Sequence, residues 1–133
     1  MNADAAAAAE RDASWTVVIP YFNEEHFIRA TLETLAAQSF RDFRLILVDN
    51  GSTDASRAIV EDFQRAHPEM SIALLEEREP GQAAALKCGI DAVRSDFTAI
   101  CDADTHYPPD YLKTADRLLR QRPEAAAALA ASG

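Results

Sequence analysis

FTAICDAD, residues 97–104, is an apolar run that ends in two carboxylates one residue apart. The run has the length of a buried β-strand, so Asp102 and Asp104 would follow the carboxyl end of that strand. Carboxylate oxygens suit Mg²⁺ or Mn²⁺, ions that usually keep some waters and share substrate phosphates. A D-x-D triplet alone is also a common solvated turn. The stretch therefore predicts a strand with a candidate metal site at its end, and the rest of the chain has to support the second part.

Three other short apolar runs also precede longer segments with helical periodicity. We expect strands at residues 15–19, 43–48, 71–75 and 97–101, and helices at about residues 24–38, 54–66, 82–93 and 109–122. Pro20 is expected to stop the first strand, and Ser52 and Thr53 are candidate N-caps of the second helix. The predicted inward-facing residues of the helices are, in order, Ile28, Leu32 and Leu35; Ala55, Ile59, Phe63 and Ala66; Leu86, Ile90 and Val93; and Leu112, Ala115 and Leu119. The apolar run at residues 125–133 is compatible with the start of a further strand.

Alternating strands and helices predict an α/β fold, with a mostly parallel sheet flanked by helices. In such sheets, ligands bind beyond the carboxyl ends of the strands. The polar residues and glycines of this chain gather at those ends, at residues 21–25, 49–54, 79–82 and 102–106. The loops at the opposite ends have no comparable cluster. We therefore expect a single site at one edge of the sheet.

The composition is that of one small globular unit. The chain has 133 residues, of which 48% are hydrophobic and 26% charged, and its net charge is −9. That charge argues against a nucleic-acid partner and against general binding to anionic membranes. Residues 1–14 are Ala-rich and acidic and lack the features of a signal peptide, so we expect a flexible tail before a unit at residues 15–133. Cys88 and Cys101 lack C-x-x-C spacing and are expected to be small buried side chains.

Four segments occur in an order that is typical of one enzyme family. They are VVIPYFNE at residues 17–24, VDNGSTD at 48–54, GQAAALKCG at 81–89 and DAD at 102–104. Together they resemble the family 2 glycosyltransferases over about residues 15–120. The resemblance implies a GT-A fold, a nucleotide-diphosphate sugar as donor, a bound Mn²⁺ or Mg²⁺, and sugar transfer with inversion at the anomeric carbon. It also implies a role in cell-envelope or polysaccharide biosynthesis.

The resemblance implies roles for individual residues as well. Asp104 would be the principal metal ligand, and Asp102 would face the ribose or bind the metal through water. Asp49 would face the base, where a carboxylate can accept from a uracil or guanine N–H. The other residues expected at the donor nucleotide are Pro20, Tyr21, Asn23, Glu24, Ser52, Gly81 and Lys87. Glu24 is equally compatible with the first turn of a helix, and Lys87 with a solvated helix position.

The chain departs from the family pattern in two respects. Asn50 stands where the family often has a second acid. The general base and the acceptor pocket of the family come from a segment well downstream of the D-x-D turn, and this chain ends at Gly133. We therefore expect a truncated, donor-binding N-terminal part of a transferase, inactive by itself, whose acceptor is unknown. The expected location is cytoplasmic, at the inner face of a membrane in the full-length protein, with membrane contact only through segments outside this chain.

Other functions fit the sequence less well or remain as alternatives. Haloacid-dehalogenase-type phosphatases also have D-x-D after a strand, but on the first strand and with Thr or Val where this chain has His106. A dinucleotide-binding Rossmann domain is excluded, because no G-x-G-x-x-G follows the first strand. A non-catalytic nucleotide-binding module stays open as the alternative to a transferase.

Overall fold

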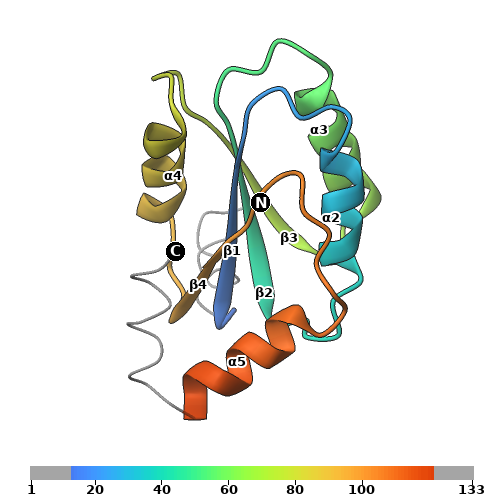
Figure 1. Ribbon diagram of the computed structural model, residues 1–133, viewed down its shortest axis with the longest axis vertical. Helices are drawn as coiled ribbons and strands as arrows, with labels where there is room; N and C mark the ends of the chain where they lie inside the picture. The colour runs from blue at the N-terminus through green and yellow to red at the C-terminus, as the bar shows by residue number, and fades with distance from the viewer. Residues whose placement is uncertain (1–12, 122–133) are drawn as a thin grey trace.

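The computed structural model describes residues 13–121 and shows four strands and four helices in strict alternation (Figure 1). The strands are β1 (Trp15–Tyr21), β2 (Phe43–Asp49), β3 (Ser71–Glu76) and β4 (Phe97–Ile100). The helices are α2 (Ile28–Ala36), α3 (Ser56–Ala66), α4 (Gln82–Asp91) and α5 (Tyr111–Gln121). The predicted tail, except residues 13 and 14, and the apolar run at residues 125–133 lie outside the described residues.

The four strands form one parallel sheet in the order β3-β2-β1-β4, which confirms the predicted fold class. Tyr21 pairs with Asp49, and Asp49 with Glu76, so the carboxyl ends of β1, β2 and β3 are level. The chain moves outward from β1 to β3 and then returns to the other side of β1 to form β4. The topological switch point therefore lies between β1 and β4, where open parallel sheets bind ligands.

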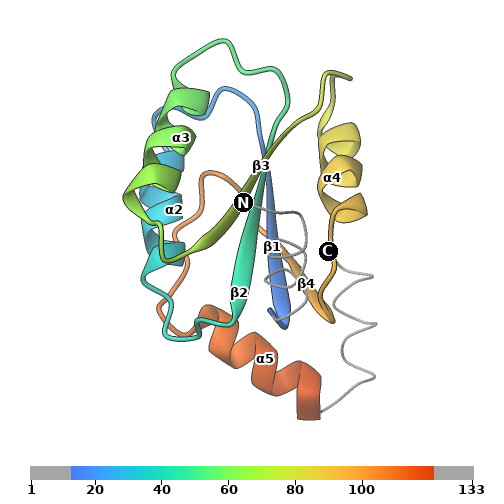
Figure 2. The ribbon, with the colours of Figure 1, turned by 180° about the vertical axis from the view of Figure 1, so that it is seen from behind.

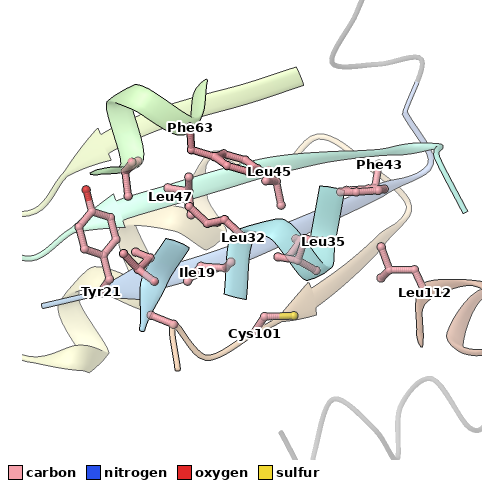
Figure 3. Close-up of a cluster of buried hydrophobic side chains, with 14 of the residues drawn as sticks. Ile19, Tyr21, Leu32, Leu35, Phe43, Leu45, Leu47, Phe63, Cys101 and Leu112 are labelled. Carbon is pink, nitrogen blue, oxygen red and sulfur yellow. The ribbon is translucent and has the colours of Figure 1, made fainter. Parts of the chain in front are cut away.

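The helices cover both faces of the sheet. Helices α2 and α3 pack together on one face and α4 packs on the other, as Figures 1 and 2 show from opposite sides. Side chains of β1 and β2 alternate between the two layers: Val17 and Leu45 belong to the core under α2, and Val18 and Ile46 to the core under α4. Helix α5 closes the larger core through Leu112 (Figure 3). The α2 and α5 stripes were predicted correctly: Ile28, Leu32, Leu35 and Leu112 are buried, and Ala115 and Leu119 pack against them.

Pro20 does not stop β1, which continues to Tyr21. Position 20 pairs with Val48 of β2, but the pairing between β1 and β4 already ends at Val18 and Ile100. Pro20 therefore has a strand neighbour on one side only, and its missing N–H costs no ladder hydrogen bond on the other. This end of the strand also brings Pro20 and Tyr21 to the site described below.

The inward-facing residues predicted for the second and third helices are confirmed only in part. In α3, Phe63 is buried and Ile59 packs against the core, as predicted, whereas Ala55 and Ala66 are exposed. Ser56 and Val60 are buried in addition. The predicted N-caps were also wrong: Ala55 is the N-cap, without a side-chain cap, and the backbone N–H of Ser56 donates to Asp54 Oδ1 at 2.9 Å.

In α4 the buried residues are Ala85 and Gly89, while Ile90 is 40% exposed. A Cβ at Gly89 would lie 2.5 Å from Val18 Cγ1, so the helix lies too close to the sheet for a larger side chain at that position. Of the stripe predicted for α4, Leu86 and Val93 pack against the core and Ile90 does not, while the fully buried residues of the helix are the small Ala85 and Gly89.

Candidate functional site

A cavity of about 650 Å³ lies at the carboxyl ends of the strands. All four polar turns singled out in the sequence contribute to its wall. The lining residues are Pro20 and Tyr21 at the end of β1, and Phe22 and Glu24 after it; Asn50 after β2; Pro80, Gly81, Gln82 and Ala85 around the start of α4; and Asp102, Ala103 and Asp104 after β4. The cavity spans the switch point between β1 and β4.

The charged side chains that line the cavity are three acids, and no Lys or Arg is among the lining residues. Burial raises the pKa of Glu24, and Asp104, Asp54 and Asp102 raise it further by repulsion. Glu24 thus shares the electrostatic environment of the D-x-D acids. Its alternative place in a helix first turn was wrong, because α2 begins only at Ile28.

The D-x-D turn is held by buried polar contacts from α2 and from its own loop. Thr31 is fully buried and its hydroxyl donates to the carbonyl oxygen of Ala103 at 2.9 Å. The backbone N–H of Asp102 donates to the hydroxyl of Tyr107 at 2.8 Å. The backbone N–H of Tyr107 in turn donates to Thr34 Oγ1 at 3.1 Å. These bonds leave the carboxylates of Asp102 and Asp104 exposed on the cavity wall.

Two exposed carboxylates fit a particular kind of metal ion. Within residues 13–121, no group of three or more His, Cys, Asp or Glu side chains is placed to hold a metal by itself. Mg²⁺ and Mn²⁺ are bound by one or two carboxylates when waters and substrate phosphates complete their shell. The donor set of Asp102 and Asp104 fits such an ion and not a structural metal enclosed by protein ligands.

The start of α4 forms another part of the cavity wall. Gly81 is its N-cap residue, with φ of +118°, and no side chain caps the helix. Glycine is the residue that adopts this backbone conformation without a steric penalty. The first N–H groups of a helix lack partners within the helix and favour an anion.

The turns after β1 and β2 are bonded to each other. Asn23, with φ of +52°, accepts from the backbone N–H of Thr53 at 2.8 Å through its side-chain oxygen. The backbone N–H of Asn23 donates to Ser52 Oγ at 3.0 Å. Asn23 and Ser52 are not among the lining residues of the cavity; they fix the loops that form its rim.

Asp49 lies below the cavity floor and not on its wall. It is 3% exposed, its Oδ1 accepts from the backbone N–H of Ser52 at 2.9 Å, and its Oδ2 is 3.9 Å from Arg57 Nε. Its predicted contact with a base stays a prediction. Lys87 lies on the exposed side of α4, outside the cavity lining, and pairs with Asp91 at 2.8 Å.

Several lining residues were not among the predicted site residues. They are Phe22, Asn50, Pro80, Gln82, Ala85 and Ala103, of which Phe22 and Pro80 present apolar surface. All of them except Pro80 lie inside the four quoted segments. Treating every residue of those segments as a candidate would have found these five.

Comparison with known proteins decides the family. The model of Glycosyl transferase family 2 matches residues 16–130. The chain belongs to this family. It is 38% identical over 109 residues to an undecaprenyl-phosphate 4-deoxy-4-formamido-L-arabinose transferase of Photorhabdus laumondii, covering 77% of this chain and 34% of that protein.

Solved structures of similar proteins establish the fold. The mannosyltransferase PcManGT from Pyrobaculum calidifontis, in complex with GDP-Man and Mn²⁺, matches with a TM-score of 0.76 and 32% identity over 80% of this chain and 32% of that chain. TarS of S. aureus, in complex with UDP-GlcNAc, matches with a TM-score of 0.70 and 24% identity over 81% of this chain and 31% of that chain. The fold of this family 2 chain is GT-A, as expected from the sequence. The chain thus spans about a third of the length of the Photorhabdus laumondii transferase and of the mannosyltransferase.

Proposed function

We propose that this chain is the donor-binding part of an inverting glycosyltransferase whose donor is a nucleotide-diphosphate sugar. The observation that supports this most strongly is the cavity, because it joins all four family segments at the switch point of the sheet. The cavity wall includes two exposed carboxylates and an uncapped helix N-terminus. A diphosphate needs both features, a place for a cation and a set of N–H donors.

Individual residues have distinct roles in this proposal. Asp104 is the principal ligand of Mn²⁺ or Mg²⁺, and Asp102 faces the ribose or the metal through water. Gly81 and the first turn of α4 approach the diphosphate. When bound, the ion supplies Lewis-acid stabilisation of the charge on the departing diphosphate.

The nucleoside is proposed to lie at the β1 and β2 side of the cavity. Pro20, Tyr21 and Glu24 line that side, and Asn23 and Ser52 hold its rim. Asp49 is proposed to face the base, and since its carboxylate is buried, that contact requires the Ser52 turn or the Arg57 side chain to move. Lys87 reaches a phosphate only by leaving Asp91, so its role is the least supported of the set.

The acid-rich wall makes donor binding depend on the cation. Within residues 13–121 no Lys or Arg lines the cavity, so the charged side chains there offer a diphosphate only negative charge. The metal must therefore bring the positive charge, and a nucleotide without it should bind weakly.

The rest of the proposal concerns the whole protein. Because the chain spans only about a third of the length of these relatives, we propose that the general base and the acceptor site belong to segments outside it. Alone, the chain would bind the donor without efficient transfer. The undecaprenyl-phosphate relative supports a cytoplasmic reaction in cell-envelope or polysaccharide biosynthesis, at the membrane face. No helix within residues 13–121 has the length and apolar character needed to cross a membrane.

Thermal stability tests the proposal. The purified chain should melt at a higher temperature with Mn²⁺ plus UDP, GDP or dTDP. A ligand at a hundredfold excess over its Kd adds about 2.7 kcal/mol to the free energy of unfolding. Asp104→Asn should abolish the shift. Asp96→Asn, which removes a carboxylate just before β4 and away from the cavity, should preserve it. A folded wild type that shows no shift with any of the three nucleotides would contradict the proposal.

A further inference from the structure

The side-chain amide of Asn50 joins the end of β2 to the loop that leads into α4. Its Nδ2 donates to the carbonyl oxygens of Glu77 at 2.9 Å and Glu79 at 2.8 Å, and its Oδ1 accepts from the backbone N–H of Gly81 at 3.0 Å. The backbone N–H of Asn50 also donates to the carbonyl oxygen of Tyr21 at 2.9 Å. One residue thus connects the ends of β1 and β2 to residues 77–81.

These partners require an amide at position 50. Two carbonyl oxygens need donors and one N–H needs an acceptor. The side-chain amide of Asn offers an NH₂ group as donor and an oxygen as acceptor on the same carbon. The neighbours therefore fix which end of the amide is nitrogen. An aspartate would present oxygen to both carbonyls and would add a further negative charge to a wall that already has Glu24, Asp102 and Asp104.

The bonded loop controls where α4 begins. Gly81 is the N-cap residue of α4 and lines the cavity together with Asn50 and Pro80. Pro80 and Gly81 are exposed, so buried packing does not hold them in place. The backbone N–H of Glu77 donates to the carbonyl oxygen of Asp49 and that of Glu79 to the side chain of Glu77, while the carbonyl oxygen of Gly81 accepts from the N–H of Ala85 within α4. Asn50 therefore bonds Gly81 directly to the end of β2.

We propose that Asn50 is a positioning residue for donor binding, which holds residues 77–81 and the first turn of α4 at the distance that a nucleoside diphosphate requires. The inference rests on the proposed function, because that function supplies the ligand.

The test compares Asn50→Asp, Asn50→Ala and Gln64→Glu in the full chain. Gln64 is a matched control, since its Nε2 also donates to a backbone carbonyl, that of Ile72 at 3.0 Å, but it lies on α3 away from the cavity. The measurements are the Kd of UDP and GDP with Mn²⁺, the Kd of Mn²⁺ alone by electron paramagnetic resonance, and the hydrogen-exchange rate of the Gly81 amide.

Both Asn50 variants should weaken binding of the preferred nucleotide by roughly tenfold or more and speed exchange of the Gly81 amide by a similar factor. Asn50→Ala should leave the Kd of Mn²⁺ alone unchanged, because the D-x-D turn is held by other residues. Gln64→Glu should change none of the three. Asn50→Ala also guards against a folding defect of Asn50→Asp, since it adds no charge.

The possible contrary results distinguish a failure of the proposed function from a failure of the role of Asn50. A wild type that binds neither nucleotide would overturn the proposed function, and the donor role of Asn50 with it. If the wild type binds but both Asn50 variants bind equally well, the donor role of Asn50 alone is wrong. Weaker binding with an unchanged Gly81 exchange rate would refute positioning through the loop.

Discussion

The hydroxyl of Thr31 in α2 donates a hydrogen bond of 2.9 Å to the carbonyl oxygen of Ala103, the residue between the two acids of the D-x-D turn. Both residues are buried, with exposed fractions of 0% and 6%. A helix on one face of the sheet therefore fixes the backbone that presents Asp102 and Asp104 to the cavity. The two carboxylates can face solvent because the backbone between them is held by the buried hydroxyl of Thr31.

Replacing Thr31 by Val keeps the shape of the side chain and removes the hydroxyl. The buried carbonyl of Ala103 would lose its donor, so the free energy of unfolding should fall by about 1–3 kcal/mol. Binding of Mn²⁺ together with nucleotide should also weaken. Thr31→Ser, which retains the hydroxyl, should restore metal binding more fully than stability. Denaturant unfolding and calorimetric titration measure the two effects, and equal metal affinity in Val and Ser variants would show that the bond does not position the acids.

Gly89 should not tolerate a methyl group. A Cβ there would lie 2.5 Å from Val18 Cγ1 and 3.1 Å from Val48 Cγ2. We expect Gly89→Ala to lower the free energy of unfolding by about 1–3 kcal/mol through overpacking. Adding Val18→Ala should relieve the clash, so that the double variant is more stable than the sum of the single effects predicts. Additive effects in denaturant unfolding would mean that α4 can shift away from the sheet at little cost.

Glycine should also be required at position 81, because of its backbone conformation and not because of crowding. Its φ of +118° is unfavourable for any L side chain, although a Cβ there would contact nothing within 4 Å. Gly81→Ala should therefore destabilise the chain by about 1–3 kcal/mol through backbone strain, or move the start of α4 to avoid it. Either response should weaken nucleotide binding measured by calorimetry. Wild-type affinity and wild-type stability together would rule out this strain.

Because of Asp116, the free energy of unfolding should vary with pH in the acidic range. Burial by itself would raise the pKa of its carboxyl, but hydrogen bonds from Trp15 Nε1 at 2.8 Å and Arg120 Nε at 2.7 Å, with the charge of Arg120, lower the pKa overall. A carboxyl with a lowered folded-state pKa stabilises the fold above its unfolded pKa of about 3.9, and this stability is lost as the pH falls through the folded pKa.

Asp116→Asn tests this dependence by removing the charge while keeping an acceptor for Trp15. The wild type should be more stable than the variant at pH 6, and the difference should shrink as the pH falls below about 4. Thermal unfolding followed by circular dichroism from pH 6 to pH 2.5 measures the difference. A difference that stays constant across that range would show that the charge of Asp116 does not contribute.

The features that were predictable from the sequence are those with local signals. The α2 stripe of Ile28, Leu32 and Leu35 was correct because large apolar residues at helical spacing made the buried face. The α4 stripe was correct for Leu86 and Val93 but missed Ala85 and Gly89, because close packing against Val18 favours Gly89 over a larger residue, and small residues give no hydrophobic signal. The strand through Pro20 was missed because its tolerance depends on where a distant strand, β4, ends.

The candidate site, too, was predictable only where the signal is local in the sequence. Asp102 and Asp104 were predictable because strand and acids are adjacent in the chain. The bonds of Asn50 join positions 27 to 31 residues apart, and no local pattern indicates them. The burial of Asp49 was equally hidden, since it follows from the Ser52 turn folding over its carboxylate.

Anomalous X-ray scattering would test the proposed metal and donor site directly, with crystals of the chain grown in MnCl₂ and the nucleotide that raises its melting temperature most. We expect a manganese peak at Asp104, near Asp102, with the diphosphate between that ion and the first turn of α4. A manganese peak elsewhere, or nucleotide density outside the cavity of Glu24, Asn50 and Gly81, would contradict the proposed site.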